Sequence, residues 1–187
     1  MLIIDNYDSF SYNIVQYVKI LGVNPIVIKN DEMSLADIKR LKFEKILLSP
    51  GWGNPDNSGV TMEVIDFYKD GMPILGVCLG MQCIAKYFGA EIVKAREPFH
   101  GKNSEIYFDE GKAIFDGMKQ GFSATRYHSL VVCVGEDNPH IKICAKTEDG
   151  IPMGLKINDK PIWGVQFHPE AYLTENGIKI FENFLKF

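Results

Sequence analysis

Short apolar runs alternate with amphipathic stretches through the first half of the chain. The runs are rich in Ile, Val and Leu, and each is followed by a stretch in which apolar residues recur at helical spacing. This alternation is typical of a parallel sheet whose buried strands are joined by crossover helices. The predicted strands span residues 1–5, 24–30, 45–50 and 73–78. The predicted helices span residues 11–22, 34–41, 59–71 and 79–89.

Helix start and stop signals agree with these elements. Gly22 and Gly89 stand where two helices should end, and glycine readily takes the left-handed conformation found at helix C-termini. Ser34 precedes the helix that it would begin, and Asp8 or Ser9 precedes the first helix. These side chains are predicted N-caps because they can accept hydrogen bonds from free backbone N–H groups.

After residue 90 the pattern changes to short alternating runs separated by Gly, Asp and Asn. These runs predict a largely antiparallel second half, with strands at 104–109, 122–134, 140–147, 153–157 and 162–168 and a last helix at 174–187. The expected fold class is α/β: an open, mostly parallel twisted sheet flanked by helices, with a flavodoxin- or Rossmann-like core and a smaller antiparallel sheet. No repeat or linker marks a boundary, so we expect a single domain over residues 1–187.

The composition narrows the function classes. The 187-residue chain is 46% apolar and 24% charged with a formal net charge of −4, and its basic residues form no stripe, so nucleic acid is not an expected partner. We expect no membrane association and a cytoplasmic location, because neither a signal peptide nor a bilayer-length apolar run is visible. The cysteines lack zinc-ligand spacing, which predicts free thiols and no metal site for Cys78, Cys83, Cys133 and Cys144.

The first candidate for chemistry is Cys78, which stands in "GVCLG" where a predicted strand meets a predicted helix. The spacing matches a nucleophile elbow, in which flanking glycines let neighbouring elements approach closely. A helix N-terminus also stabilises a thiolate and a developing oxyanion. On this motif alone, a small buried cysteine is an equally good interpretation. Cys83, which has the apolar spacing of a helix face, is predicted to lie in the core.

A thiol nucleophile needs a base, and the base needs a group that orients it. His168 and Glu170 in "GVQFHPE" offer both, because Pro169 fixes the backbone between them at the end of a strand-like run. A histidine after a strand is also commonly a plain surface residue. Three other histidines are candidate bases: His100, His128 and His140. None of them has a carboxylate as near in the sequence as Glu170 is to His168.

A second glycine-bearing turn, "LLSPGWGNPDNSG", follows another predicted strand and should lie at the same edge of the sheet. It could be a plain tight turn, or its backbone N–H groups could complete an oxyanion hole. A phosphate loop fits less well, because no Gly-Lys-Ser/Thr ending follows.

Six motifs, in this order, resemble those of the class I (triad) glutamine amidotransferases. They are "IIDNYDSFSYN", "LSPGWGNP", "GVCLGMQ", "HGK", "YHSL" and "GVQFHPE", and together they cover nearly the whole chain. Within that family they are most similar to the small (component II) subunits of anthranilate synthase and of aminodeoxychorismate synthase. The sequence gives no decision between these two pathways.

The resemblance implies a set of roles for individual residues. Cys78, His168 and Glu170 would form a triad that hydrolyses the side-chain amide of glutamine and releases ammonia. The backbone N–H groups of Gly51 and Leu79 would form the oxyanion hole. The glutamine-binding residues would be Gly51, Trp52, Gly53, Gln82, Ser129 and Leu130. The "HGK" loop would face a partner, or be a solvated turn, and consists of His100, Gly101 and Lys102.

The resemblance also implies a partner, a large chorismate-binding synthase subunit (component I) that receives the ammonia. It implies no cofactor in this chain, with Mg²⁺ expected only in the partner subunit. The chain departs from the family pattern at three positions. Trp52 replaces a common proline, Met81 a frequent histidine and Ala171 a common serine.

Two further functions remain open from the residues. One is a stand-alone thiol hydrolase of the same architecture, such as a γ-glutamyl hydrolase. The other is a non-catalytic, flavodoxin-like binding module whose site would be the acidic "IIDNYDS" turn. That second function leaves "GVQFHPE" unexplained.

Overall fold

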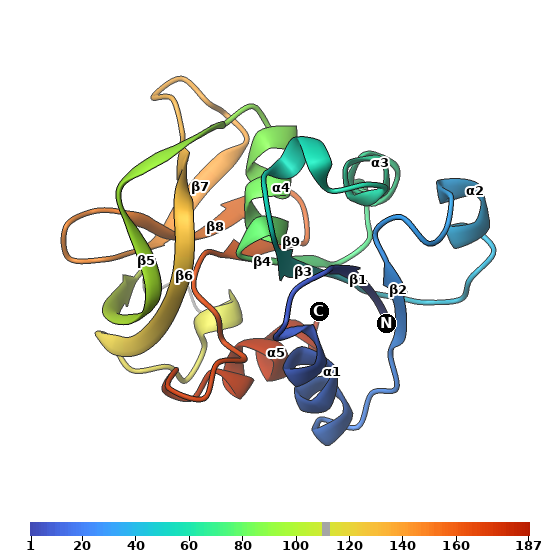
Figure 1. Cartoon of the computed structure of the whole chain (residues 1–187), viewed down its shortest axis with the longest axis horizontal. Helices are drawn as coiled ribbons and strands as arrows, with labels where there is room; N and C mark the ends of the chain where they lie inside the picture. Colours follow the sequence, from blue (N-terminus) through green and yellow to red (C-terminus); the bar gives the residue numbers. More distant parts are fainter. Residues whose placement is uncertain (110–112) are drawn as a thin grey trace.

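The computed structural model describes residues 1–109 and 113–187 (Figure 1). Within these ranges, nine strands form a sheet in the order β2-β1-β3-β4-β9-β8-β7-β5-β6. The strands are β1 (Leu2–Asn6), β2 (Ile26–Lys29), β3 (Ile46–Gly51), β4 (Ile74–Val77), β5 (Glu91–Phe108), β6 (Phe122–Cys133), β7 (Ile141–Lys146), β8 (Pro152–Ile157) and β9 (Ile162–Val165). The helices are α1 (Ser11–Ile20), α2 (Leu35–Ile38), η1 (Pro55–Asn57), α3 (Thr61–Tyr68), α4 (Leu79–Tyr87), η2 (Ala113–Phe115) and α5 (Ile178–Phe184).

The sheet is parallel on one side and antiparallel on the other. Strands β2, β1, β3, β4 and β9 run parallel, so their carboxyl ends meet at one edge. From β9 onward the neighbours β8, β7, β5 and β6 are antiparallel. The predicted α/β class is therefore confirmed, and β9 joins the two parts because it pairs in parallel with β4 and antiparallel with β8.

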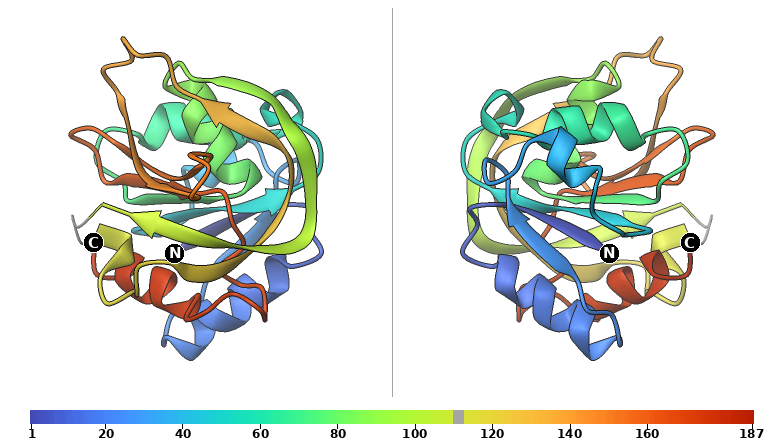
Figure 2. Two further views of the ribbon diagram at one scale, coloured as in Figure 1. Left: turned by 90° about the vertical axis from the view of Figure 1, so that its left-hand side faces the viewer. Right: turned by 90° about the vertical axis from the view of Figure 1, so that its right-hand side faces the viewer.

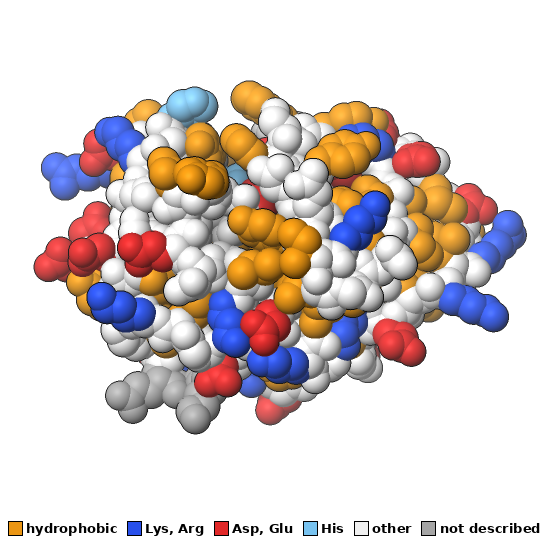
Figure 3. Space-filling view, turned by 90° about the horizontal axis from the view of Figure 1, so that it is seen from below, with side chains coloured by type: hydrophobic (Ala, Val, Ile, Leu, Met, Phe, Trp, Pro, Cys, Tyr) orange, Lys and Arg blue, Asp and Glu red, His pale blue; other side chains and the backbone are white. Residues whose placement is uncertain are grey.

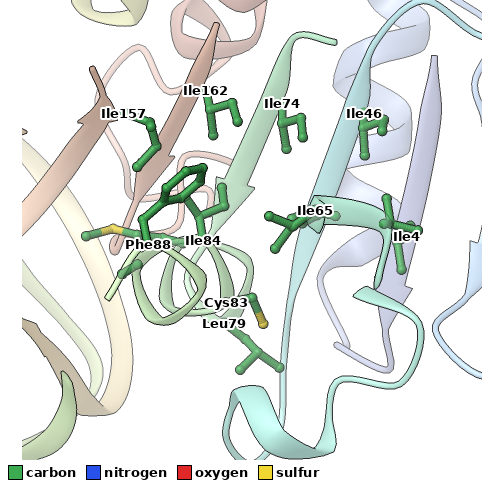
Figure 4. Packing of buried hydrophobic residues seen from close by; sticks show 14 of the residues in the cluster. Ile4, Ile46, Ile65, Ile74, Leu79, Cys83, Ile84, Phe88, Ile157 and Ile162 are labelled. Atoms are coloured by element: carbon green, nitrogen blue, oxygen red, sulfur yellow. The ribbon is translucent and has the colours of Figure 1, made fainter. Parts of the chain in front are cut away.

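Helices cover both faces of the parallel part, α3 and α4 on one face and α1 and α5 on the other (Figure 1). Side chains of a strand alternate between faces, so each strand feeds two cores. In β1, Leu2 and Ile4 pack beneath α3 and α4, while Ile3 packs toward α1 and α5. Figure 4 shows the first core, with Ile84 of α4 and Phe88, the residue after this helix, lying over isoleucines from successive strands.

Several elements differ in length from the prediction. Three are shorter than expected: α2 (expected at 34–41), α3 (expected at 59–71) and β9 (expected at 162–168). The largest differences are in β5 and α5. The strand expected at 104–109 is the end of β5, which begins at Glu91 and pairs with β6 as a long curved arm (Figure 2). The part of β5 before residue 104 is mostly exposed and lacks apolar alternation, so its pattern predicts no strand. The helix expected at 174–187 covers only Ile178–Phe184, because residues 174–177 form turns.

The predicted caps are confirmed at three of four places. The Ser34 hydroxyl accepts from the backbone N–H of Asp37, and Gly22 and Gly89 have positive φ after their helices. The prediction for α1 is wrong, because its N-cap is Phe10 and no side chain caps it. Asp8 instead accepts from the backbone N–H of Phe10 itself, 2.7 Å away.

The outer surface carries both apolar and charged groups. Seen from the side of α1 and α5, hydrophobic side chains gather near the centre, with charged side chains of both signs around them (Figure 3). In the described part of the chain, no helix combines the length and the apolar character needed to cross a membrane.

Candidate active site

Strand β4 passes into helix α4 through a sharp turn centred on Cys78. Cys78 has φ 51°, in the left-handed region that residues with a side chain rarely adopt. Its neighbours must be small for this turn to fit. A Cβ atom on Gly76 would lie 2.4 Å from the backbone carbon of Gly80, and one on Gly80 would lie 2.3 Å from the carbonyl oxygen of Leu48. The structure therefore has the elbow that the "GVCLG" spacing predicts.

The elbow separates Cys78 from the cysteine that follows it on α4. Cys78 is 5% exposed, and its sulfur lies 3.5 Å from the side-chain nitrogen of Gln166 and 3.9 Å from the carbonyl oxygen of Tyr127. Cys83 is fully buried in the core beneath α4, and this burial raises the pKa of its thiol to about 12. Its predicted core position is confirmed, and its thiol is inert at neutral pH.

His168 and Glu170 lie together at the end of β9. His168 Nδ1 is 2.6 Å from Glu170 Oε1, and both side chains are almost completely buried. Among the described residues, His168 Nε2 and Glu170 Oε2 have no hydrogen-bond partner. One ring nitrogen is thus bound to the carboxylate while the other is free for a reacting group.

The surroundings fix the position of the His168 ring. The backbone N–H of His168 donates to the carbonyl of Thr125, and the hydroxyl of Thr174 donates to the carbonyl of His168. The rings of Tyr127 and Phe10 pack edge-on against the imidazole, with centroids 5.2 and 6.2 Å away. Side chains far apart in the sequence therefore hold the ring in one orientation.

Charge at the site favours a protonated imidazole. Burial alone lowers the pKa of His168, but the Glu170 carboxylate and the Cys78 sulfur act against it and hold this pKa well above its ordinary value. A positive ring between a carboxylate and a sulfur can stabilise a thiolate and later donate a proton.

The structure also brings Gly51 and Leu79 together. A Cβ atom on Gly51 would lie 2.4 Å from the carbonyl oxygen of Asn6 and 3.0 Å from Leu79 Cδ2, so only glycine fits. The end of β3 therefore packs directly on the first residue of α4. Both residues belong to the predicted oxyanion hole.

The predicted glutamine-binding residues divide into two groups. Gln82 and Leu130 are in contact, because the Gln82 side-chain nitrogen donates to the Leu130 carbonyl, 3.3 Å away. Ser129 precedes Leu130 on β6 and is exposed. Trp52 and Gly53 project outward, with Trp52 75% exposed.

The other two departures from the family pattern lie inside the protein. Met81 is fully buried, and a Cβ atom on Gly164 would lie 2.8 Å from its Cγ, so Met81 packs under the sheet. Ala171 is buried directly after Glu170. Neither is one of the predicted triad residues.

The "HGK" loop lies within β5, next to the site. His100 pairs with Tyr127 across the arm, and their rings meet edge-on with centroids 5.4 Å apart. Tyr127 also packs on His168, so the Tyr127 ring lies between His100 of this loop and His168. Gly101 and Lys102 are exposed.

The remaining histidines are not placed as bases for Cys78. His128 accepts from Arg126 Nε at 3.0 Å, and burial together with the Arg126 charge lowers its pKa to about 4. His140 packs against the ring of Phe88.

Two residues at the site were missed by the sequence reasoning. One is Asp8. A carboxylate oxygen of Asp8, a ring nitrogen of His168 and a carboxylate oxygen of Glu170 lie within 4.8 Å of one another, and among the described residues these three side chains form a group that could hold a metal ion. Gln166 touches the Cys78 sulfur. Strand alternation could have found Gln166, because residues two apart share a face and His168 follows it at that distance.

An elbow cysteine beside a buried histidine–carboxylate pair defines a thiol-dependent acyl-transfer or hydrolase site on an α/β sheet. Residues 2–187 match the family Glutamine amidotransferase class-I, and the chain belongs to that family. The chain is therefore a glutamine amidotransferase. Its family and its relatives favour this function over the two alternatives, a stand-alone γ-glutamyl hydrolase and a flavodoxin-like binding module.

Curated relatives match the chain over nearly its whole length. "Anthranilate synthase component 2" of Saccharolobus solfataricus is 48% identical over 189 residues, covering 98% of this chain and 96% of the relative. "Aminodeoxychorismate/anthranilate synthase component 2" of Bacillus subtilis is 44% identical, covering 100% and 95%. "Aminodeoxychorismate synthase component 2" of Escherichia coli is 43% identical, covering 99% and 98%.

Among solved structures, the chain resembles a protein of Thermoplasma acidophilum described as a GMP synthase subunit. The two share 27% identity with a TM-score of 0.85, over 99% of this chain and 91% of the other. The two proteins therefore share their overall fold.

Proposed function

We propose that this glutamine amidotransferase is the ammonia-supplying subunit of a chorismate-using synthase, with Cys78, His168 and Glu170 as its triad. The observation that carries the triad is the buried His168–Glu170 pair, 2.6 Å apart, beside a cysteine held at a strained elbow. The relatives named as component 2 of anthranilate or aminodeoxychorismate synthases support the choice of partner.

In the first half-reaction, the Cys78 sulfur attacks the carboxamide carbon of glutamine. A tetrahedral intermediate forms, and its negative oxygen accepts hydrogen bonds from the backbone N–H groups of Leu79 and Gly51. His168 then gives its Nε2 proton to the amide nitrogen, and the C–N bond breaks. Ammonia leaves, and a γ-glutamyl thioester remains on Cys78.

In the second half-reaction, the neutral His168 takes a proton from water, which attacks the thioester carbon. The C–S bond breaks, glutamate leaves, and the sulfur returns as a thiolate beside the protonated ring. Glu170 keeps Nδ1 protonated and aimed at the carboxylate throughout, so Nε2 is the nitrogen that exchanges protons.

The substrate would lie between the turn after β3 and the end of β6. We assign glutamine binding to the residues carried by the family motifs: Gly51, Trp52, Gly53, Gln82, Ser129 and Leu130. The hydrogen bond from Gln82 to the Leu130 carbonyl supports a common site for Gln82, Ser129 and Leu130.

The partner would cover the mouth of this site. Exposed apolar side chains come from segments that carry or adjoin site residues, and such patches mark interaction surfaces. They are Tyr7, Tyr12, Trp52, Tyr172 and Leu173. We propose that these side chains and the loop of His100, Gly101 and Lys102 contact a large chorismate-binding subunit.

We propose that the glutaminase step needs no metal or organic cofactor, because the thiol, the imidazole and the carboxylate supply nucleophile, acid and base. Mg²⁺ would serve only the partner subunit. A cytoplasmic location fits the four free cysteines, Cys78, Cys83, Cys133 and Cys144.

A replacement of the nucleophile tests this function. In the complex with the co-purified synthase subunit, Cys78→Ala should abolish glutamine-dependent product formation and retain ammonia-dependent formation. Cys133→Ala, which removes an exposed cysteine, should keep both activities. Identification of the product as anthranilate or aminodeoxychorismate decides the pathway. Glutamine-dependent synthesis by the Cys78→Ala complex contradicts the proposal.

A further inference from the structure

A side-chain amide outside the triad points at the reactive sulfur. Gln166 follows β9 and is completely buried, and its side-chain nitrogen lies 3.5 Å from Cys78 Sγ. This is a hydrogen-bond distance for sulfur, which is larger than oxygen. Gln166 lies two residues before His168, so the strand end that delivers the base also delivers this amide.

The orientation of the amide follows from its neighbours, because a glutamine amide could otherwise be turned by 180°. The Leu130 carbonyl can only accept, so the atom of Gln82 that lies 3.3 Å away must be its NH₂ group. The same NH₂ group lies 3.0 Å from the Gln166 side chain, which must therefore present its oxygen. The NH₂ group of Gln166 then faces Cys78.

The Leu130 carbonyl accepts a second hydrogen bond, from His128. Arg126 Nε can only donate, so it fixes His128 Nε2 as an acceptor at 3.0 Å. The neutral ring then carries its proton on Nδ1 and donates to the Leu130 carbonyl, 2.9 Å away. The low pKa of His128, about 4, keeps this ring neutral at physiological pH. The Leu130 carbonyl thus accepts from both His128 and Gln82, which leaves each donor and acceptor between Arg126 and Gln166 with one assignment.

We infer that Gln166 is a further catalytic residue, whose side-chain N–H holds the Cys78 sulfur and stabilises negative charge on it; this rests on the proposed role of Cys78. A thiolate accepts a hydrogen bond better than a thioester sulfur does. The contact is therefore strongest before attack and again as the C–S bond breaks. Such a difference between states accelerates deacylation rather than only binding substrate.

Alkylation of the full-length chain with iodoacetamide at pH 7 tests this inference, with each cysteine followed by mass spectrometry. Gln166→Met removes the donor, and Gln166→Glu keeps the shape and the oxygen that faces Gln82 but places an acceptor at the sulfur. Both variants should alkylate Cys78 about three- to tenfold more slowly, since loss of thiolate stabilisation is only partly offset by higher intrinsic nucleophilicity. The exposed Cys133 in the same samples should react at an unchanged rate.

Steady-state glutaminase kinetics of the complex give a second readout that a purely structural role would not produce. The kcat of both Gln166 variants should fall about tenfold or more, with KM changed by less than about threefold. The control Gln16→Glu adds the same charge on the exposed face of α1 and should change neither constant. Thermal unfolding confirms that the compared variants are folded.

Wild-type alkylation of Cys78 in the folded Gln166 variants would overturn the inference, as would a rise in KM with kcat unchanged. The proposed function fails separately, through an active Cys78→Ala complex. The two failures are therefore distinguishable.

Discussion

At the scale of single residues, the site depends on a backbone conformation that Cys78 does not favour. Its φ of 51° with ψ −105° is a combination that costs residues with a side chain about 1–3 kcal/mol. Gly76 and Gly80 let the surrounding backbone close tightly enough to impose it. The strain serves to point the sulfur away from the strand, toward Gln166 and Tyr127.

This strain predicts an unusual order of stability for two inactive variants. The free energy of unfolding of Cys78→Gly should be about 1 kcal/mol higher than that of Cys78→Ala. Glycine relieves the backbone strain, and the energy gained by this relief exceeds the entropic cost of glycine. Urea unfolding of the two chains measures the difference. The matched pair at Cys83, inside α4, should show the opposite order, since glycine costs about 1 kcal/mol relative to alanine there. Equal stability of the two Cys78 variants contradicts the strain argument.

At the scale of elements, the segment between β9 and α5 positions His168, the proposed base. Thr174 links it to β6, because its hydroxyl accepts from the Thr125 N–H and donates to the His168 carbonyl. At the other end, the backbone of Gly177 lies against Pro169. A Cβ atom on Gly177 would lie 1.8 Å from the Pro169 carbonyl oxygen.

The close approach of Gly177 predicts that Gly177→Ala displaces the His168–Glu170 pair. Glutaminase kcat should fall about tenfold or more, because small displacements of catalytic groups have large effects. The free energy of unfolding should fall by about 1–3 kcal/mol through overpacking. Enzyme assays and urea unfolding measure both effects. Gly135→Ala, at an exposed position with nothing within 4 Å of the added Cβ, should change neither.

Elements with a buried face were predictable, and those without one were not. The parallel strands and α4 could be predicted because their apolar residues face the two cores. The first part of β5 could not, since its side chains are mostly exposed and its pairing with β6 depends on backbone hydrogen bonds. The α1 cap failed for a related reason, because the Asp8 carboxylate binds the N–H of Phe10 before the helix begins.

The site was predictable where a motif carries both partners. His168 and Glu170 are two residues apart, so their contact follows from local geometry. The contacts of Gln166 with Cys78 and Gln82 join residues more than 80 positions apart, and only the folded sheet edge brings them together.

At the scale of the whole molecule, two buried histidines give stability opposite dependences on pH. The folded pKa of His128 is about 4 against an ordinary 6.5, so the unfolded chain binds its proton first and stability falls as the pH drops from 6.5 toward 4. The pKa of His168 is raised, so its contribution is fully present below 6.5 and is lost as the pH rises through the raised value.

The acid side of this dependence can be measured with His128→Gln. The free energy of unfolding, obtained from urea titrations between pH 4 and 6.5, should rise less steeply with pH in this variant than in the wild type. His140→Gln removes an exposed histidine and should retain the wild-type slope. A wild-type slope in His128→Gln would show that His128 is not kept neutral by its surroundings.

The long sequence separation at the elbow also bears on how the protein is made. Gln166 lies 88 residues after Cys78, so at ordinary translation speeds the ribosome needs roughly 5 to 20 seconds to supply it after the cysteine has been incorporated. During that interval Cys78 lacks both the proposed base, His168, and the amide of Gln166. The nascent chain therefore cannot consume glutamine or present an activated sulfur to oxidants until β9 has taken its place beside β4.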